Sequence, residues 1–201
     1  AKAAAMPLSL LTAWHMLVGR ARVRPGQKVL IQAGASGVGS LAIQVAKLHG
    51  AEVAVTASTE RKRERCMELG ADHAWTYEEA KTEVRSWTQK RGVDIVMDHV
   101  GEATWKQSVR ALARGGTLVT CGATTGHQAN IDLRVLFFKQ LNLLGSTMGT
   151  MDEMQEAWAA VTTGAIRPVV DKIMPMTELA KAHTMLESRA LAGKVVMEQN
   201  L

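Results

Sequence analysis

Short apolar runs alternate with longer amphipathic stretches along most of this 201-residue chain. From Lys28 onward, runs rich in valine, isoleucine and leucine are followed by stretches of about 10 to 15 residues with helical spacing of their apolar side chains. This order is typical of βαβ units, because two neighbouring parallel strands need a crossover between them, usually a helix. The sequence therefore predicts an α/β protein with a doubly wound parallel sheet.

The expected strands have definite places in the sequence. They cover residues 29–33, 52–57, 73–76, 94–98, 117–121 and 142–146, with helices over about 37–49, 60–69, 78–89 and 103–113. Gly50 and Gly70 follow two of these helices, where a C-terminal glycine is favoured. Six parallel strands connected in this way form a Rossmann-type sheet.

The two ends of the chain do not fit this repeated unit. Residues 1–18 are rich in alanine and leucine and predict a helix that is broken at Pro7. Residues 165–201 predict a strand, a helix and a strand, which are too few to enclose a core of their own. We expect a connecting helix over 1–18, a Rossmann domain over 19–164 and a C-terminal segment over 165–201 that needs another partner.

Composition favours a soluble, cytoplasmic, globular protein. The chain is 47% hydrophobic, but its apolar runs are too short to cross a bilayer. Cys66 and Cys121 are too few for a disulfide framework and too far apart for a metal-ligand cluster, which suits a reducing compartment. The formal charge of +5 is spread along the chain apart from a basic run over 61–65. We therefore expect a small-molecule substrate and neither nucleic acid nor a membrane as partner.

The first expected strand leads directly into the turn Gly34-Ala35-Ser36-Gly37-Val38-Gly39 and then into a helix. This is the setting of a dinucleotide-binding fingerprint, in which backbone amides and the helix N-terminus receive a pyrophosphate. Ser36 occupies the place of the second glycine, so its side chain must point away from the cofactor or hydrogen-bond it. We predict cofactor contacts at Gly34, Ser36 and Gly37. The alternative is an ordinary glycine-rich turn between a strand and a helix.

The loop after the second strand favours NADP(H) over NAD(H). In NAD-specific domains, a carboxylate about 20 residues beyond the glycines binds the ribose hydroxyls. Ala57 stands at that place and is followed by Ser58 and Lys62, a hydroxyl and a cation that could bind a 2′-phosphate. Alternatively, the basic run over 61–65 is a solvated helix face, because its cations cannot all face one phosphate.

Several short motifs are spread over nearly the whole chain. They are Ala3-Ala4-Ala5-Met6-Pro7 before Thr12-Ala13, Val23-Arg24-Pro25-Gly26, Ile43-Gln44-Val45-Ala46-Lys47, Glu68-Leu69-Gly70-Ala71-Asp72 and Gly193-Lys194-Val195-Val196. With the glycine turn, they resemble the medium-chain dehydrogenase/reductase superfamily, in particular its quinone oxidoreductase-like and zinc-type alcohol dehydrogenase-like enzymes. The resemblance implies a cofactor domain plus a C-terminal segment that returns to an N-terminal catalytic domain, which is missing here.

By this resemblance, residues along the chain would line the cofactor cleft. Thr12 would lie near the nicotinamide, and Gly37 and Val38 at the pyrophosphate. The adenosine phosphate would be surrounded by Ser58, Lys62 and Tyr77. The cleft at the carboxyl ends of the later strands would be lined by His99, Val100, Gly122 and Ala123. His99 stands where many relatives have a small hydroxyl residue, and a histidine with no special role at a strand end is an equal alternative.

The same resemblance raises the question of zinc. In zinc alcohol dehydrogenases, one catalytic ligand precedes the family threonine by four positions, and here that residue is Leu8, which cannot coordinate a metal. We therefore predict no metal in this chain.

The resemblance implies an NAD(P)-dependent oxidoreductase that transfers a hydride between NADP(H) and a quinone, enone, carbonyl or alcohol. No catalytic acid or base is assigned. Two other functions stay open: a nucleotide-binding module or redox sensor without catalysis, and a methyltransferase, which Ala57 disfavours. Strand 142–146 resembles the edge strand through which such enzymes pair, so we expect a homo-oligomer, a dimer or a tetramer.

Overall fold

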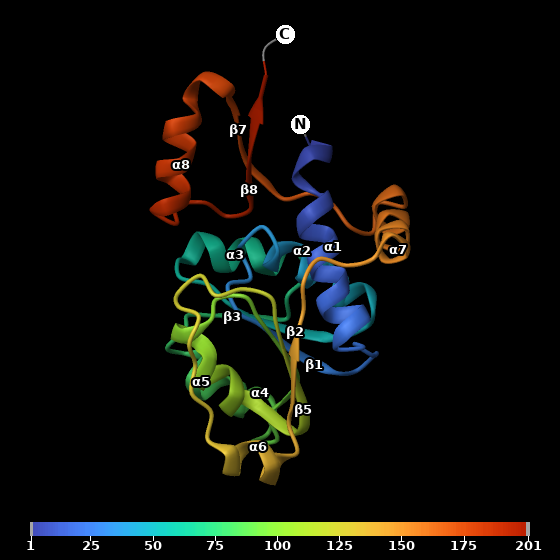
Figure 1. The fold of residues 1–201 in the computed structure, drawn as a ribbon, viewed down its shortest axis with the longest axis vertical. Helices are drawn as coiled ribbons and strands as arrows, with labels where there is room; N and C mark the ends of the chain where they lie inside the picture. Colours follow the sequence, from blue (N-terminus) through green and yellow to red (C-terminus); the bar gives the residue numbers. More distant parts are fainter. Residues whose placement is uncertain (1, 200–201) are drawn as a thin grey trace.

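A six-stranded parallel sheet organises the fold (Figure 1), seen in a computed structural model that describes residues 2–199. Its strands are β1 (Lys28–Ile31), β2 (Glu52–Thr56), β3 (His73–Trp75), β4 (Val93–Asp98), β5 (Leu112–Thr120) and β6 (Asn142–Gly145). They lie in the order β3-β2-β1-β4-β5-β6, and every neighbouring pair is parallel. The expected doubly wound sheet is confirmed. Its strand order reverses between β1 and β4, the place where open α/β sheets bind ligands.

Six helices connect the strands of this sheet or follow them. They are α2 (Gly39–Leu48), α3 (Glu60–Glu68), α4 (Ala80–Trp87), α5 (Glu102–Ala111), α6 (Leu133–Lys139) and α7 (Met151–Thr162). The last two were not expected, although α7 begins with a capping box: Thr150 accepts from the Glu153 amide, and the Glu153 carboxylate accepts from the Thr150 amide. None of the helices between residues 2 and 199 has both the length and the apolar character needed to cross a bilayer.

Successive side chains along the strands pack alternately into two hydrophobic cores, one on each face of the sheet. Val29 and Ile31 of β1 pack with α2, whereas Leu30 packs on the opposite face with buried residues of α4 and α5. Helices cover both faces, which explains why the strands consist of continuous apolar runs. The core on the α2 face is the larger one, and α2 is buried along most of its length.

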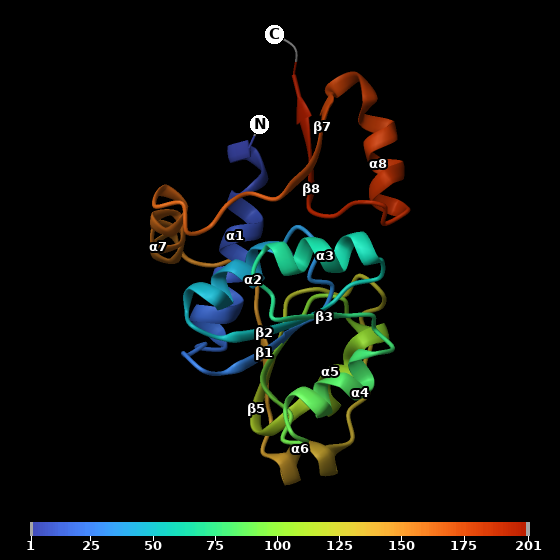
Figure 2. The same cartoon turned by 180° about the vertical axis from the view of Figure 1, so that it is seen from behind.

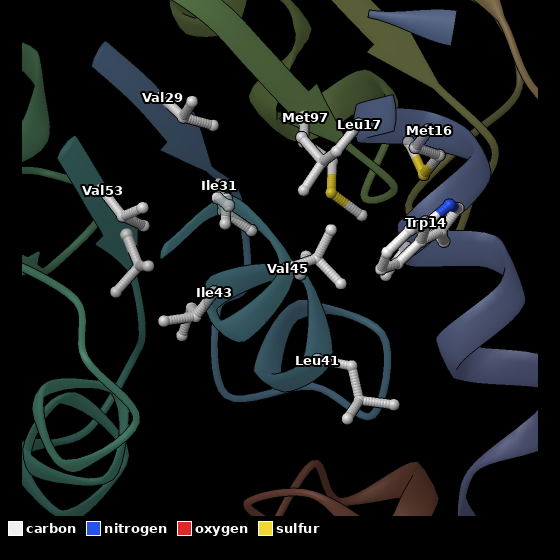
Figure 3. Close-up of a cluster of buried hydrophobic side chains, with 14 of the residues drawn as sticks. Trp14, Met16, Leu17, Val29, Ile31, Leu41, Ile43, Val45, Val53 and Met97 are labelled. Carbon is white, nitrogen blue, oxygen red and sulfur yellow. The ribbon is translucent and has the colours of Figure 1, made fainter. Parts of the chain in front are cut away.

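The N-terminal segment joins the core on the α2 face. It consists of η1 (Lys2–Ala5), α1 (Pro7–Trp14) and η2 (His15–Arg20), and Pro7 is the first residue of α1 rather than a break within it. Trp14, Met16 and Leu17 lie beside Val45 of α2 and Met97 of β4 (Figure 3). The apolar face of this segment therefore packs against the Rossmann sheet and its helix α2.

The C-terminal segment forms a small unit of its own. A two-stranded parallel sheet consists of β7 (Val170–Pro175) and β8 (Lys194–Glu198), connected through η3 (Met176–Glu178) and α8 (Leu179–Glu187). This unit lies at one end of the molecule, α1 runs from that end into the middle beside α2, and α4, α5 and α6 lie at the other end (Figures 1 and 2). Ile173, Met176, Leu179 and Leu186 are each about half exposed on it. The division into 1–18, 19–164 and 165–201 stays a prediction.

Candidate functional site

A cleft of about 300 Å³ opens at the carboxyl ends of the strands, beside the switch point between β1 and β4. The loops that follow the first five strands, β1 to β5, form most of its wall, together with the start of α3. The end of α8 and the segment between α8 and β8 form the rest. Its lining residues are Ala33, Ala35, Ser36, Gly37, Ala57, Ser58, Lys62, Tyr77, His99, Val100, Thr124, Thr125, Leu186, Arg189, Leu191 and Gly193. Predicted residues from four separate parts of the sequence thus meet in one place.

The glycine turn has the geometry that an anion-binding loop requires. A Cβ atom on Gly34 would lie 2.6 Å from Val55 Cβ, and one on Gly39 would overlap the Ala33 carbonyl oxygen, so both positions must be glycine for β1, β2 and α2 to pack. The amides of Ala35, Gly37 and Val38 donate no hydrogen bond to any residue in the described range 2–199. Free amides at the N-terminus of α2 fit a pyrophosphate.

Ser36 is held by a partner that the sequence did not link to it. Its Oγ atom accepts a hydrogen bond from the Gly39 amide at 2.9 Å and lies 2.8 Å from His99 Nε2. Burial lowers the pKa of His99, which keeps the imidazole neutral near neutral pH. The Ser36 side chain therefore points across the turn to the loop after β4, and away from the open amides.

The loop after β4 is fixed by Asp98, a buried carboxylate at the strand end. Its Oδ1 atom accepts from the amides of Val100 at 2.9 Å and Gly101 at 3.1 Å, and its Oδ2 atom accepts from the hydroxyls of Thr104 and Ser108, each at 2.7 Å. These four bonds tie β4 to the start of α5 and set the position of His99 and Val100 in the cleft wall. Sequence reasoning included Asp98 only as the end of a strand.

Two cations lie at the end of the cleft that holds Ser58 and Tyr77. Lys62 Nζ donates to the carbonyl oxygen of Arg189 at 2.6 Å, and both side chains line the cleft. Burial, followed by the neighbouring charge of Arg61, lowers the pKa of Lys62. Burial raises the pKa of Tyr77. Arg61 itself turns away and binds Asp171 at 3.1 Å, so the basic run over 61–65 does not act as one group.

Arg189 and Lys194 are site residues that sequence reasoning missed. Arg189 follows α8, and Lys194 begins β8, so both come from the segment that we assigned to another domain. The Lys194 side chain lies over the glycine turn: a Cβ atom on Gly37 would be 2.5 Å from Lys194 Cε and 3.2 Å from Nζ. The Gly193-Lys194-Val195-Val196 motif could have identified Lys194 as a site residue, because it is part of the family resemblance. No local sequence pattern identifies Arg189.

Five predicted residues do not line this cleft: Thr12, Gly34, Val38, Gly122 and Ala123. Thr12 lies in α1, where its hydroxyl donates to the Leu8 carbonyl oxygen at 2.7 Å. Gly122 passes close to the loop after β4, since a Cβ atom there would be 2.7 Å from the His99 carbonyl oxygen. The cleft thus brings together Ser36 and Gly37 of the glycine turn, the three residues predicted around the adenosine phosphate, and His99 and Val100. The cofactor contacts of all twelve predicted residues stay predictions.

The side chains that could bind a metal ion are dispersed over residues 2–199. Within residues 2–199, no three histidine, cysteine, aspartate or glutamate side chains gather closely enough to hold a metal ion. Leu8, at the position of a family zinc ligand, is 57% exposed on α1 and offers no donor atom. The absence of a metal from this chain stays a prediction.

Residues 37–163 match the family described as zinc-binding dehydrogenase. The protein named "Probable quinone oxidoreductase" from Schizosaccharomyces pombe is 32% identical over 203 residues, which cover 97% of this chain and 62% of that protein. A solved NAD-dependent alcohol dehydrogenase superposes with a TM-score of 0.93 at 40% identity, covering 98% of this chain and 58% of its own. A crotonyl-CoA carboxylase/reductase in complex with NADP gives a TM-score of 0.89 at 29% identity, covering 95% and 54%.

The chain spans less than two thirds of each of these relatives. The matched residues include the glycine turn from Gly37 onward and all strands of the main sheet after β1. From this match over more than half of its length, and from the shared fold, the chain belongs to the zinc-binding dehydrogenase family, within the medium-chain dehydrogenase/reductase superfamily.

Proposed function

We propose that this chain is the NADP(H)-binding part of an oxidoreductase, which transfers a hydride between NADP(H) and a quinone, enone, carbonyl or alcohol. The observation that carries the proposal is that Lys62 and Arg189 both line the cleft beside Ser58, where Lys62 Nζ donates to the backbone carbonyl oxygen of Arg189. Ala57 occupies the place where a carboxylate would bind the ribose of NAD(H). Two cations and a hydroxyl without that carboxylate favour a 2′-phosphate.

The choice of cofactor depends on this chain's own residues, because the names of its solved relatives include both nucleotides. One is an NAD-dependent alcohol dehydrogenase, and another is a carboxylase/reductase in complex with NADP. A well-formed charge-assisted hydrogen bond contributes about 1.5 to 3 kcal/mol. One such bond from Lys62 or Arg189 is enough to make NADP(H) the preferred cofactor.

We assign each part of the cofactor to residues along the cleft. The free amides of Ala35, Gly37 and Val38 would hold the pyrophosphate, with Lys194 Nζ above the turn. Ser58, Lys62, Tyr77 and Arg189 would surround the adenosine phosphate, and His99, Val100, Thr124 and Thr125 would form the wall toward the nicotinamide. A bound nicotinamide cofactor supplies the hydride chemistry, and the residues of this chain bind and orient it.

The assembly is a further part of the proposal. Strand β6 is the last strand of the sheet order, so one of its edges has no neighbour among the described strands. The exposed apolar side chains of Leu133, Phe137 and Phe138 precede it on α6. An open strand edge beside apolar surface favours pairing with a second copy. A homo-oligomer formed through β6 stays a prediction.

Parallel titration of the chain with NADPH and NADH tests the cofactor assignment. We expect NADPH to bind more tightly, and Lys62→Ala to weaken NADPH binding about tenfold while NADH changes by less than about twofold. Lys62→Arg keeps the positive charge and should retain most of the preference. Lys181→Ala, on the exposed surface of α8, removes one lysine outside the cleft and should change neither affinity. Equal losses for the two nucleotides in Lys62→Ala would contradict the assignment.

A further inference from the structure

A second and larger cleft, of about 860 Å³, lies between α4, α5 and α6 at the amino ends of β4 and β5. Its lining residues are Ala80, Lys81, Val84, Arg85, Lys90, Arg91, Gly92, Ala103, Lys106, Gln107, Arg110, Ala111, Leu112, Val135 and Lys139. The cofactor cleft lies at the opposite edge of the sheet. Within residues 2–199, β7, α8 and β8 lie at the other end of the molecule and α1 packs beside α2, so these segments do not cover this cleft (Figures 1 and 2).

The charge of this cleft has one sign. Seven lysine and arginine side chains line it, and no aspartate or glutamate of the described part of the chain does. Two of the seven are paired at its rim, Lys81 with Glu78 and Arg91 with Asp94. For the other five, no carboxylate within residues 2–199 lies at ion-pair distance: Arg85, Lys90, Lys106, Arg110 and Lys139. The positive charge is therefore not compensated where it converges.

Two further groups indicate that this cleft is more than a solvated basic surface. The Gln107 Nε2 atom is buried and has no hydrogen-bond partner among the described residues, although the side chain lines the cleft. Lys139 Nζ is anchored by the carbonyl oxygens of Leu112 at 2.7 Å and Arg110 at 3.1 Å, at the C-terminal end of α5. Burial of the ammonium group lowers the pKa of Lys139, and the neighbouring positive charge of Arg85 lowers it further.

We propose that this cleft binds a small oligophosphate, an anion with two or more linked phosphoryl groups. Arginine guanidinium groups and lysine ammonium groups are the side chains that bind phosphate oxygens. In the same wall, the Gln107 amide nitrogen has no partner among the described residues. The volume suits a small molecule. No aromatic side chain of the described residues lines the cleft, which disfavours single-stranded nucleic acid, because its bases need platforms for stacking.

Calorimetric titration with inorganic tripolyphosphate tests this site, with three double variants that each remove two positive charges. Arg85→Gln/Arg110→Gln alters the proposed site and should weaken binding at least about tenfold. Arg24→Gln/Lys172→Gln changes two exposed cations outside both clefts and should leave the affinity within about twofold. Lys62→Gln/Arg189→Gln alters the cofactor cleft and should leave a tripolyphosphate site of unchanged affinity. Failure of NADPH to bind would leave these expectations intact, because the two clefts are separate.

A neutral variant separates recognition from net charge. Gln107→Leu removes the unpartnered amide without altering the charge, and it should weaken tripolyphosphate binding about threefold or more. Orthophosphate at matched ionic strength should bind far more weakly than tripolyphosphate, since it offers one phosphoryl group. ATP binding that depends on Arg110 would support the site and identify a nucleotide as the source of the phosphate chain. Equal losses in all three double variants, or loss only in Lys62→Gln/Arg189→Gln, would overturn the proposal.

Discussion

Replacement of Asp98 by alanine is expected to lower the free energy of unfolding by about 4 kcal/mol, because this buried residue fixes the loop that carries His99 and Val100 into the wall of the cofactor cleft. The buried carboxylate accepts four hydrogen bonds, from the amides of Val100 and Gly101 and from the hydroxyls of Thr104 and Ser108. Alanine would leave the two amides and the Ser108 hydroxyl without this acceptor, whereas the Thr104 hydroxyl keeps the Gly101 carbonyl oxygen at 3.2 Å. Each buried unsatisfied donor costs about 1 to 3 kcal/mol before water enters the space. Urea unfolding followed by tryptophan fluorescence measures the change.

Asp98→Asn and Glu64→Ala provide the comparison. Asparagine keeps the shape but presents an NH₂ group to two of the donors, so its loss should be smaller than that of alanine but still above about 1 kcal/mol. Glu64 is exposed on α3 and makes no hydrogen bond or ion pair in the described part of the chain, so Glu64→Ala should change stability by less than about 0.5 kcal/mol. An Asp98→Ala protein as stable as Glu64→Ala would show that the carboxylate does not hold the loop.

Replacement of Gly39 by alanine is expected to cost about 3 kcal/mol of stability, even though alanine is the better helix former. A Cβ atom at this position would overlap the Ala33 carbonyl oxygen and approach Gly34 Cα to 2.9 Å. All of these neighbours are backbone atoms of the turn after β1, so α2 must move away from the sheet to make room. The same movement displaces the free amides of Gly37 and Val38, and NADPH binding should weaken together with stability.

Gly145→Ala is the matched control for Gly39→Ala. Gly145 lies in β6, and a Cβ atom there would meet nothing within 4 Å. This substitution should change the free energy of unfolding by less than about 0.5 kcal/mol and leave nucleotide binding unchanged. Similar unfolding midpoints for the two variants would mean that α2 is not packed against the turn as tightly as the structure has it.

The strands and the glycine turn could be predicted because their signals are local. An apolar run such as 29–33, a following Gly34 and Gly39, and an amphipathic helix are each visible within a few residues. Strand β5 shows the limit of this reasoning. It begins at Leu112, five residues before its expected start, because Leu112 pairs with Val93 and the strand then passes through Gly115 in a left-handed conformation.

The contacts that complete the two clefts could not be predicted, because they join distant parts of the chain. Lys62 meets Arg189 only because the return segment after α8 folds back onto α3, and no spacing in the sequence encodes that contact. The second cleft has the same origin. Its cations are dispersed from Lys81 to Lys139 and look like ordinary surface charge in the sequence, until α4, α5 and α6 bring them to one end of the sheet.

Hydrogen–deuterium exchange of the chain with and without saturating NADPH tests the central claim most directly, because it locates the nucleotide. The amides of Gly37 and Val38 have no partner in the described chain and should exchange rapidly without nucleotide. With NADPH bound, we expect marked protection of peptides over 34–39 and 58–62, and no change over 85–92 in the second cleft. Binding of NADPH without protection of the 34–39 turn, or with protection confined to another surface, would contradict the account.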